Sequence, residues 1–224
     1  MPAPADAPVL DVGSGTGIFT RHLAEALPPD VAVLGVEPSA DMRDTAARRN
    51  GPANVHYVRG FAEKLPVDDG AARAVIAATA AHWFDRPAFY AEAARKLCPG
   101  GVLAIIQYIR DAENGPAPKA VEDFLRKNGG ARVYDRPDYH AELAALPGFG
   151  AVSAHYDTVT LQLTSEEFAG LALSSSHARS VEARLGVDAT KAALIAIGNG
   201  LAGPDGIVPY DYRFELFIVE RLSR

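Results

Sequence analysis

Three glycines and one glutamate near the start of the chain have the types and spacing to hold a nucleoside. Gly13, Gly15 and Gly17 stand at alternate positions in VLDVGSGTGIFTRHL, between a short apolar run and a helical segment. Glycine at a strand-to-helix turn permits positive φ and lets a ligand approach the backbone closely. Glu37 ends the next apolar run, where an acid can accept both hydroxyls of a ribose. The pattern therefore predicts a nucleoside crevice built from this loop and Glu37.

A dinucleotide cofactor is the first alternative for such a loop. The GxGxxG spacing requires glycine at positions 13, 15 and 18, but position 18 is Ile18 and the third glycine is Gly17. The departure disfavours a nicotinamide-dependent oxidoreductase, which stays open as an alternative.

The elements that must position these residues alternate along the first half of the chain. Short apolar runs predict strands buried on both faces. A stripe of apolar side chains predicts a helix over Arg86–Lys96, which the PGG at 99–101 stops. Strands joined by helices of this length imply a doubly wound parallel sheet. The expected strands lie at 9–12, 31–37, 54–60, 72–79 and 102–108.

The alternation breaks after Tyr108, where proline and glycine punctuate the chain. Thr164 followed by Glu167 has the spacing of a capping box and predicts a helix that begins at Ser165. The other elements expected here are helices at 120–127, 139–146, 181–185 and 189–197, an extended run at 152–163, and a last strand at 210–222.

Composition limits the kind of partner and the setting. The net charge is −6 without any long basic tract, which disfavours nucleic acid and anionic membranes and favours a small molecule. The chain has no apolar run near the roughly 20 residues of a membrane span, and the start MPAPADAP lacks the features of an export signal. Its single cysteine, Cys98, excludes an internal disulfide and suits a reducing cytoplasm. No metal-ligand spacing is present.

Five successive motifs resemble those of class I S-adenosylmethionine-dependent methyltransferases. They are DVGSGTG, GVEPS, GFAEKLP, AAHWFD and LCPGGVL, and the resemblance spans Val9 to about Tyr108. HWFD looks most like the trans-aconitate methyltransferase-like branch, which acts on small molecules. The resemblance implies an α/β, Rossmann-like, doubly wound sheet of seven mostly parallel strands, the last antiparallel, with helical insertions after strands five and six. It also implies one domain over 1–224, with a cofactor-binding half at 1–110 and a substrate-facing half with a helical lid at 111–224.

The cofactor that the resemblance implies is S-adenosylmethionine. Its methionine end is expected over Asp11 and the three glycines, its ribose on Glu37, and its adenine beside Pro38–Ser39. The family's GDAE-type motif reads GFAE here, so Phe61 replaces an acid. Adenine binding is then expected from the Ala62 amide, packing by Phe61, and Glu63. We also expect Thr79, at the end of the fourth strand, to contact the cofactor.

Three residues are candidates for the chemistry because they follow strand ends or lie in covering segments: His82, Tyr108 and His177. The sulfonium activates the methyl group, so the protein must mainly position the acceptor, and a base is needed only where the acceptor loses a proton. A packed role for His82 and an exposed role for His177 stay open. We expect Trp83 and Phe84 in the core. For a carboxylate acceptor, the candidate binding residues are Arg110, Arg132 and Arg179.

Members of the family usually carry a helical segment before the first strand, whereas here that strand begins by Val9. The lid is then expected from the helices inserted after Tyr108 and Thr164 or from a partner chain, which makes a homodimer plausible, unless the chain is a shortened version. A non-catalytic or repurposed cofactor-binding protein, or a partner subunit, is the alternative to an enzyme.

Overall fold

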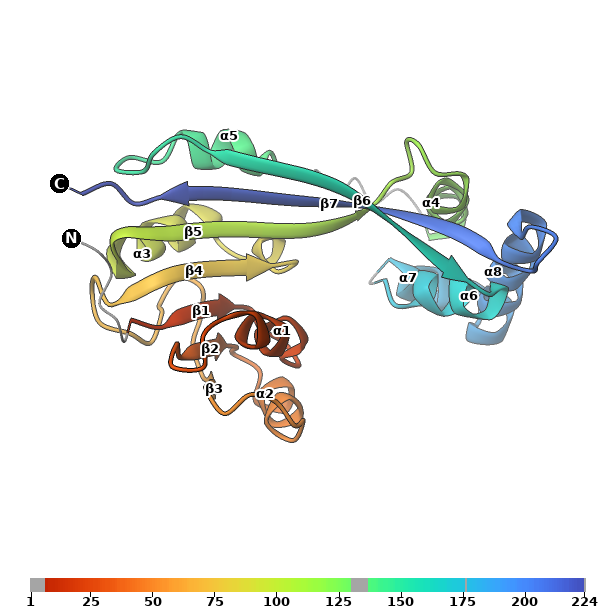
Figure 1. The fold of residues 1–224 in the computed structure, drawn as a ribbon. Coiled ribbons are helices and arrows are strands. Elements are labelled where there is room, and N and C mark those ends of the chain that lie inside the picture. The colour runs from red at the N-terminus through yellow and green to blue at the C-terminus, as the bar shows by residue number, and fades with distance from the viewer. Residues whose placement is uncertain (1–6, 130–136, 176, 224) are drawn as a thin grey trace. The chain divides into compact units, whose positions relative to one another are not determined.

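A seven-stranded sheet of order β3-β2-β1-β4-β5-β7-β6 organises the protein (Figure 1). We describe it from a computed structural model, which covers residues 7–129, 137–175 and 177–223. The sheet is the predicted Rossmann-like sheet, with its last strand antiparallel. Its strands are β1 (Val9–Val12), β2 (Val33–Val36), β3 (Val55–Val58), β4 (Ala72–Ala78), β5 (Leu97–Arg110), β6 (Ser153–Leu163) and β7 (Val208–Glu220).

The register of the parallel strands places the two predicted parts of the crevice at one edge. All four residues of β1 are buried, and β1 pairs in parallel with β2 on one side and β4 on the other. Val12 lies opposite Val36, so Gly13 and Glu37 leave the sheet side by side. The carboxyl ends of parallel strands are where ligands bind in folds of this type.

Side-chain capping fixes the starts of α2, α3, α5 and α6. The predicted capping box is confirmed, because Thr164 accepts a hydrogen bond from the Glu167 amide and the Glu167 side chain accepts one from the Thr164 amide. Asp85 and Ser39 likewise accept bonds from the first turns of the helices that follow them. The helices are α1 (Ile18–Ala26), α2 (Ala40–Ala47), the 3₁₀ turn η1 (Ala81–Trp83), α3 (Arg86–Lys96), α4 (Pro116–Gly129), α5 (Tyr139–Ala144), α6 (Ser165–Leu173), α7 (Ala178–Leu185) and α8 (Val187–Leu201).

Some boundaries differ from the sequence-based expectation. β5 begins at Leu97 rather than at residue 102, so the PGG at 99–101 lies within a strand. A Cβ at Gly101 would lie 2.9 Å from the Cys98 carbonyl oxygen and 3.1 Å from that of Arg73, so glycine permits this close approach. The first helix of the insertion begins at residue 116 rather than 120, and β7 begins and ends two residues earlier than predicted.

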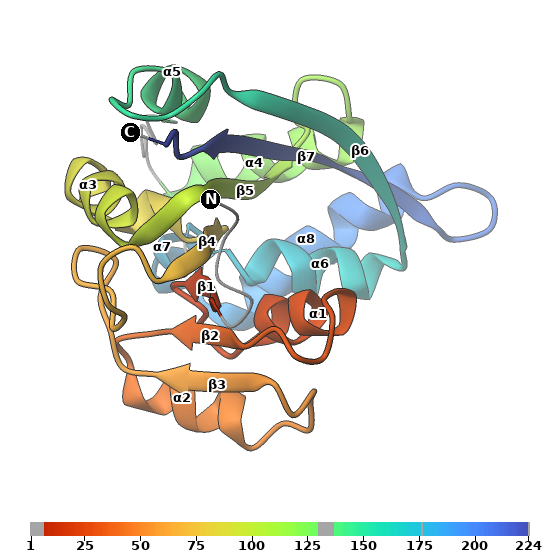
Figure 2. The same ribbon diagram turned by 60° about the vertical axis from the view of Figure 1, so that its left-hand side comes forward.

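The chain divides into two compact units, which we describe separately. The first unit comprises residues 1–107, 137–155 and 215–224, and the second comprises 108–136 and 156–214. The core of the first includes Leu10, Phe89 and Leu103, and the core of the second includes Phe168 and Tyr210. In both views of the ribbon, α1 lies beside β1 and β2, and α2 lies beside β3 (Figure 2). The proposed halves at residue 110 stay a prediction.

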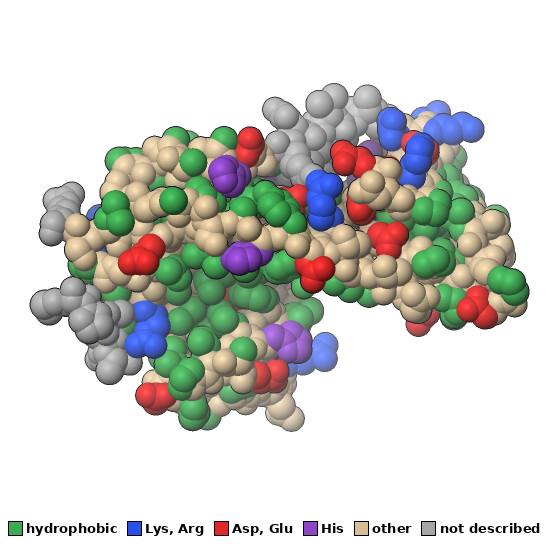
Figure 3. All heavy atoms as spheres, turned by 45° about the horizontal axis from the view of Figure 1, so that its top comes forward, with side chains coloured by type: hydrophobic (Ala, Val, Ile, Leu, Met, Phe, Trp, Pro, Cys, Tyr) green, Lys and Arg blue, Asp and Glu red, His purple; other side chains and the backbone are tan. Residues whose placement is uncertain are grey.

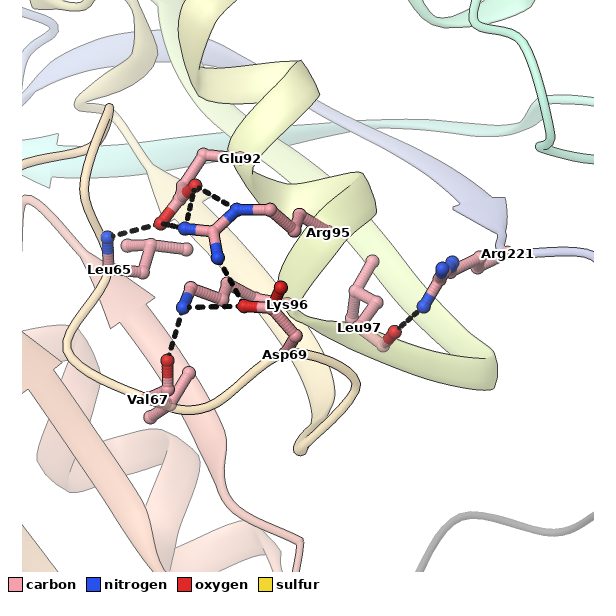
Figure 4. Close-up of polar contacts among 8 residues, drawn as sticks. All are labelled: Leu65, Val67, Asp69, Glu92, Arg95, Lys96, Leu97 and Arg221. Carbon is pink, nitrogen blue, oxygen red and sulfur yellow. Dashed lines mark hydrogen bonds and ion pairs between the residues drawn. The ribbon is translucent and has the colours of Figure 1, made fainter.

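A charged network fixes the end of α3 to the loop that precedes β4 in the first unit (Figure 4). Glu92 is buried and accepts a hydrogen bond of 2.9 Å from the Leu65 amide, and it also pairs with Arg95. Arg95 and Lys96 both pair with Asp69. Because the partly exposed arginine bridges two carboxylates, the network joins segments that are distant in sequence. It thereby holds α3, which directly follows η1 and its candidate residue His82.

Candidate active site

The glycine loop between β1 and α1 owes its shape to three residues with positive φ. Gly13, Gly15 and Gly17 have φ values of +73°, +55° and +75°, in the region that side chains disfavour. A Cβ at Gly13 would lie 2.6 Å from Ala80 Cβ, and one at Gly17 would lie 2.1 Å from the Tyr57 hydroxyl oxygen. A Cβ at Gly15 would meet no heavy atom of the described residues within 4 Å. The outer two glycines therefore permit packing, and the central one faces open space.

Glu37 connects the glycine loop to the segment that follows β2. Its side chain is buried, and its Oε2 accepts a hydrogen bond of 3.0 Å from the Gly15 amide while Oε1 accepts one of 2.9 Å from the Ser39 amide. A carboxylate oxygen has two lone pairs, so each oxygen can accept a further bond from a ligand hydroxyl. Glu37 therefore both shapes the loop and retains acceptor capacity.

A second carboxyl group lies at the end of β1. Asp11 is 1% exposed, and the Thr20 hydroxyl donates a hydrogen bond of 2.6 Å to its Oδ2. Burial raises the pKa of the Asp11 carboxyl to about 6, the Thr20 hydrogen bond opposes this rise, and the negative charge of Glu37 adds to it. Two acids close to one loop create a negative potential that favours a cationic ligand.

The GFAE segment after β3 places an exposed aromatic ring beside a buried alanine. Phe61 is 50% exposed, whereas Ala62 is buried. A Cβ at Gly60 would lie 2.6 Å from Val36 Cγ1, so the segment passes close to the end of β2. The Glu63 carboxylate accepts a hydrogen bond of 3.0 Å from the Asp85 amide. One of the predicted adenine-binding acids thus also holds the start of α3.

The sequence of residues 9–101 matches the family model of the methyltransferase domain. This segment is therefore similar to methyltransferase domains. It contains the strands β1 to β4, the glycine loop and Glu37, all within the first unit. The match disfavours the nicotinamide-dependent alternative.

Relatives and solved structures agree with this assignment. An uncharacterized methyltransferase of Mycobacterium tuberculosis, Rv3342, is 35% identical over 170 residues, which are 75% of this chain and 64% of that protein. A structure from Anaeromyxobacter dehalogenans, assigned as a type II methyltransferase, matches with a TM-score of 0.71 and 24% identity, covering 99% of this chain and 93% of the other. The geranyl diphosphate C-methyltransferase of Streptomyces coelicolor, solved with Mg²⁺, geranyl diphosphate and S-adenosylhomocysteine, matches with a TM-score of 0.54 and 20% identity, covering 98% and 74%. These likenesses show the fold.

Thr79 and His82 follow β4, within the segment that matches the methyltransferase model. Thr79 has a φ of +51°, and its amide donates a hydrogen bond of 2.8 Å to the Ile106 carbonyl. Non-glycine residues in this region of φ store strain and are enriched at functional sites. His82 is partly buried, which lowers its pKa and keeps the imidazole neutral at neutral pH. Their roles stay predictions.

The aromatic pair after His82 divides between core and surface. Phe84 packs against the core and contacts Phe89 edge to face at 5.1 Å between ring centroids, as predicted. The expectation for Trp83 was wrong, because its side chain is 71% exposed. Trp83 ends the 3₁₀ turn η1, which leaves its side chain at the surface. Trp83 is therefore a surface residue.

The other candidates for catalysis lie in the second unit. Tyr108 is 57% exposed and contacts Tyr212 and Phe214 edge to face. His177 precedes α7, and its buried Nε2 has no hydrogen-bond partner among the described residues. The structure gathers Asp11, the three glycines, Glu37, Pro38, Phe61, Ala62, Glu63, Thr79 and His82 in the first unit, and Tyr108 and His177 in the second.

The predicted carboxylate-binding arginines differ in their surroundings. Arg110 pairs with Glu122 at 3.0 Å, which reduces the charge it can offer to an acceptor. Arg179 is exposed on α7, and Arg132 lies outside the described residues. Neither Arg110 nor Arg179 therefore gains a specific role from its contacts.

Sequence reasoning missed three residues of the site. Thr20 reaches Asp11 from the first turns of α1, Tyr57 covers Gly17 and Gly35, and Ala80 meets Gly13. The sequence carries a signal only for Thr20, because Asp11 and Thr20 belong to the same strand-loop-helix unit. In the described ranges, no group of three His, Cys, Asp or Glu residues is arranged to hold a metal, and no helix there is long and apolar enough to cross a membrane.

Substitution of Gly15 tests whether the open space over the loop holds a ligand. We expect Gly15→Ala to weaken binding of S-adenosylhomocysteine at least about tenfold, because a methyl group would occupy that space. The positive φ costs about 1 kcal/mol of folding stability. Gly148→Ala is the matched control, since Gly148 has a φ of +79° and equally open surroundings. Equal affinities of the two variants, measured by equilibrium dialysis, would contradict this role.

Proposed function

We propose that the chain is an S-adenosylmethionine-dependent methyltransferase that acts on a small-molecule acceptor, a carboxylate or a hydroxyl, by in-line displacement. The observation that carries the proposal is the open space over Gly15, in a loop held by Glu37 and adjoining the buried carboxyl group of Asp11. The methyltransferase match of residues 9–101 supports it. So do solved neighbours of the same fold that were determined with S-adenosylhomocysteine or SAM.

The residues present fit this cofactor. Glu37 would accept the ribose hydroxyls with its remaining lone pairs, and the negative potential of Asp11 and Glu37 suits a cation. Pro38 and the exposed ring of Phe61 would pack against adenine, with the Ala62 amide and Glu63 as polar partners. Thr79 would contact the cofactor from the end of β4. Bound S-adenosylmethionine supplies an activated methyl group on a sulfonium, so the chain's own task is to bind the cofactor and orient the acceptor.

The catalytic assignments depend on the acceptor. His82, kept neutral by its burial, would take a proton from a hydroxyl acceptor, whereas a carboxylate needs no base. Tyr108 and His177, which belong to the second unit, stay candidates for orienting the acceptor. The exposed aromatic cluster around Tyr108 suits an acceptor with an apolar body.

The finer placement rests on the AAHWFD motif, by which we assign the chain to the trans-aconitate methyltransferase-like branch. Its acceptor would then be a small organic acid. The chain spans 64% of the length of its mycobacterial relative. The single-domain organisation, the homodimer and the cytoplasmic location therefore stay predictions.

One observation favours a second candidate, a non-catalytic protein that binds the same cofactor. Phe61 stands where the family's motif carries an acid, and its ring is half exposed. The loss of that polar contact would lower the selectivity for adenine without altering the glycine loop.

An assay with methyl-labelled S-adenosylmethionine separates the two candidates. We expect transfer to at least one member of a panel of small carboxylic acids and alcohols. For a hydroxyl acceptor, His82→Ala should reduce kcat by about 100-fold, while His22→Ala, at an exposed site on α1, should leave it unchanged. Tight cofactor binding without transfer to any acceptor would contradict the enzyme and support the binding protein.

A further inference from the structure

A pocket of about 310 Å³ lies beside the edge strand β3, and its lining includes two arginines and a histidine. Arg21 reaches it from α1, Arg49 from the loop after α2, and His56 and Tyr57 from β3. No acid is among its lining residues, although the chain has a net charge of −6. On the face drawn in Figure 3, by contrast, acidic and basic side chains are interspersed. The pocket therefore concentrates positive charge in an acidic protein.

Arg21 is held in place by contacts that leave part of its guanidinium uncommitted. Its Nη1 donates to the Thr16 carbonyl and to the Tyr57 hydroxyl, both at 3.2 Å. A Cβ at Gly51 would lie 2.8 Å from Arg21 Cδ, so the glycine lets the aliphatic part of Arg21 lie against the loop. Its Nε and Nη2 have no hydrogen-bond partner within the described ranges. Ordered donors of this kind are prepared to bind an anion.

Two other donors of the pocket have uncommitted side chains. Arg49 and His56 are exposed, and across the portion of the chain that the structure describes neither side chain makes a hydrogen bond or an ion pair. Arginine groups that converge without a carboxylate repel one another. A doubly charged oxyanion would remove this repulsion and accept charge-assisted hydrogen bonds from the planar guanidinium groups.

We propose that this pocket binds a small anion of the phosphate type, free or as the monoester of a small molecule. The volume suits one phosphate group with a short body, and the acidic chain disfavours nucleic acid as its source. The pocket is separate from the cofactor crevice, whose charged groups, Asp11 and Glu37, are acidic. It is nonetheless joined to the glycine loop, because Arg21 bonds to the Thr16 carbonyl and the Tyr57 hydroxyl donates to the Gly17 carbonyl at 3.3 Å.

Calorimetric titration of the full chain with inorganic phosphate, at constant ionic strength set with sodium chloride, tests the site. We expect saturable binding that Arg49→Ala weakens by about tenfold or more, as the loss of one charge-assisted contact predicts. Arg48→Ala is the matched control, since Arg48 is an exposed neighbour that does not line the pocket. The affinity of this variant for phosphate should stay within about threefold of that of the unsubstituted protein. Unchanged thermal unfolding of both variants shows that they fold.

Three outcomes would overturn the proposal. They are the absence of saturable binding, an equal loss in both arginine variants, and binding only to phosphatidylcholine vesicles that contain phosphatidic acid with none to phosphate or glycerol phosphate. The last outcome would assign the pocket to a lipid surface. The experiment needs neither cofactor nor methyl transfer, so its result is independent of the proposed function.

Discussion

Replacing Glu37 with alanine is expected to lower the affinity for S-adenosylhomocysteine by at least about 100-fold. The substitution removes an ionised acceptor for two ribose hydroxyls, and hydrogen bonds to charged groups contribute roughly 1.5–3 kcal/mol each. It also frees the Gly15 and Ser39 amides that Glu37 now holds. Equilibrium dialysis with labelled S-adenosylhomocysteine measures the effect.

Two controls separate ligand contact from damage to the loop. Glu37→Gln keeps the shape of the side chain and one of the two acceptor oxygens, so it should retain more thermal stability than Glu37→Ala while still weakening binding. Glu25→Ala removes an exposed acid on α1 and should change neither property. If Glu37→Ala bound the ligand within about threefold of the unsubstituted protein, Glu37 would not contact the ribose.

Replacing Asp11 with asparagine is expected to stabilise the fold at neutral pH. The pKa of this carboxyl rises from its ordinary value of 3.8 to about 6 in the folded protein, mainly through burial. The folded state therefore holds the proton more tightly than the unfolded state, so the contribution of Asp11 to stability is fully present below about pH 4 and is lost as the pH rises through about 6. The difference between these two pKa values corresponds to about 3 kcal/mol in the free energy of unfolding. Asparagine avoids this loss of stability and can still accept a hydrogen bond from the Thr20 hydroxyl.

Urea unfolding at about pH 4 and about pH 7 measures this prediction. The free energy of unfolding of Asp11→Asn should exceed that of the unsubstituted protein by up to about 3 kcal/mol at the higher pH and by much less at the lower. Asp30→Asn, at an exposed position, should show no such difference. Equal stabilities of the Asp11 variant and the unsubstituted protein at about pH 7 would refute the raised pKa.

The same substitution should discriminate between the two forms of the cofactor. S-adenosylmethionine carries a sulfonium charge that S-adenosylhomocysteine lacks, so Asp11→Asn should weaken the first more than the second. In the unsubstituted protein, the affinity for S-adenosylmethionine should fall as the pH decreases through about 6, because Asp11 then becomes neutral. A conserved ratio of the two affinities in the variant would mean that Asp11 does not face the sulfonium.

Local patterns indicated the conformation of the loop and the position of Glu37. Glycine permits positive φ, and all three glycines have it. The position of Glu37 at the end of the second strand then followed from parallel pairing, which the register of Val12 with Val36 confirms. The capping box at Thr164 was equally local and is present.

Features that depend on distant contacts were not predictable. Tyr57 covers Gly17 from a strand 40 residues further along the chain, and Glu63 holds the Asp85 amide across 22 residues. Trp83 has a large aromatic side chain of the kind often found in cores, but it lies on a 3₁₀ turn that exposes it. No periodicity encodes such contacts, because they arise only when the elements pack.

Calorimetric titration of the purified chain with S-adenosylmethionine and S-adenosylhomocysteine tests the central claim most directly. The account predicts a single site with a dissociation constant in the micromolar range, which Glu37→Ala removes. The absence of saturable heat for either ligand up to millimolar concentration would contradict it, since the glycine loop and its two acids would then not form a cofactor site.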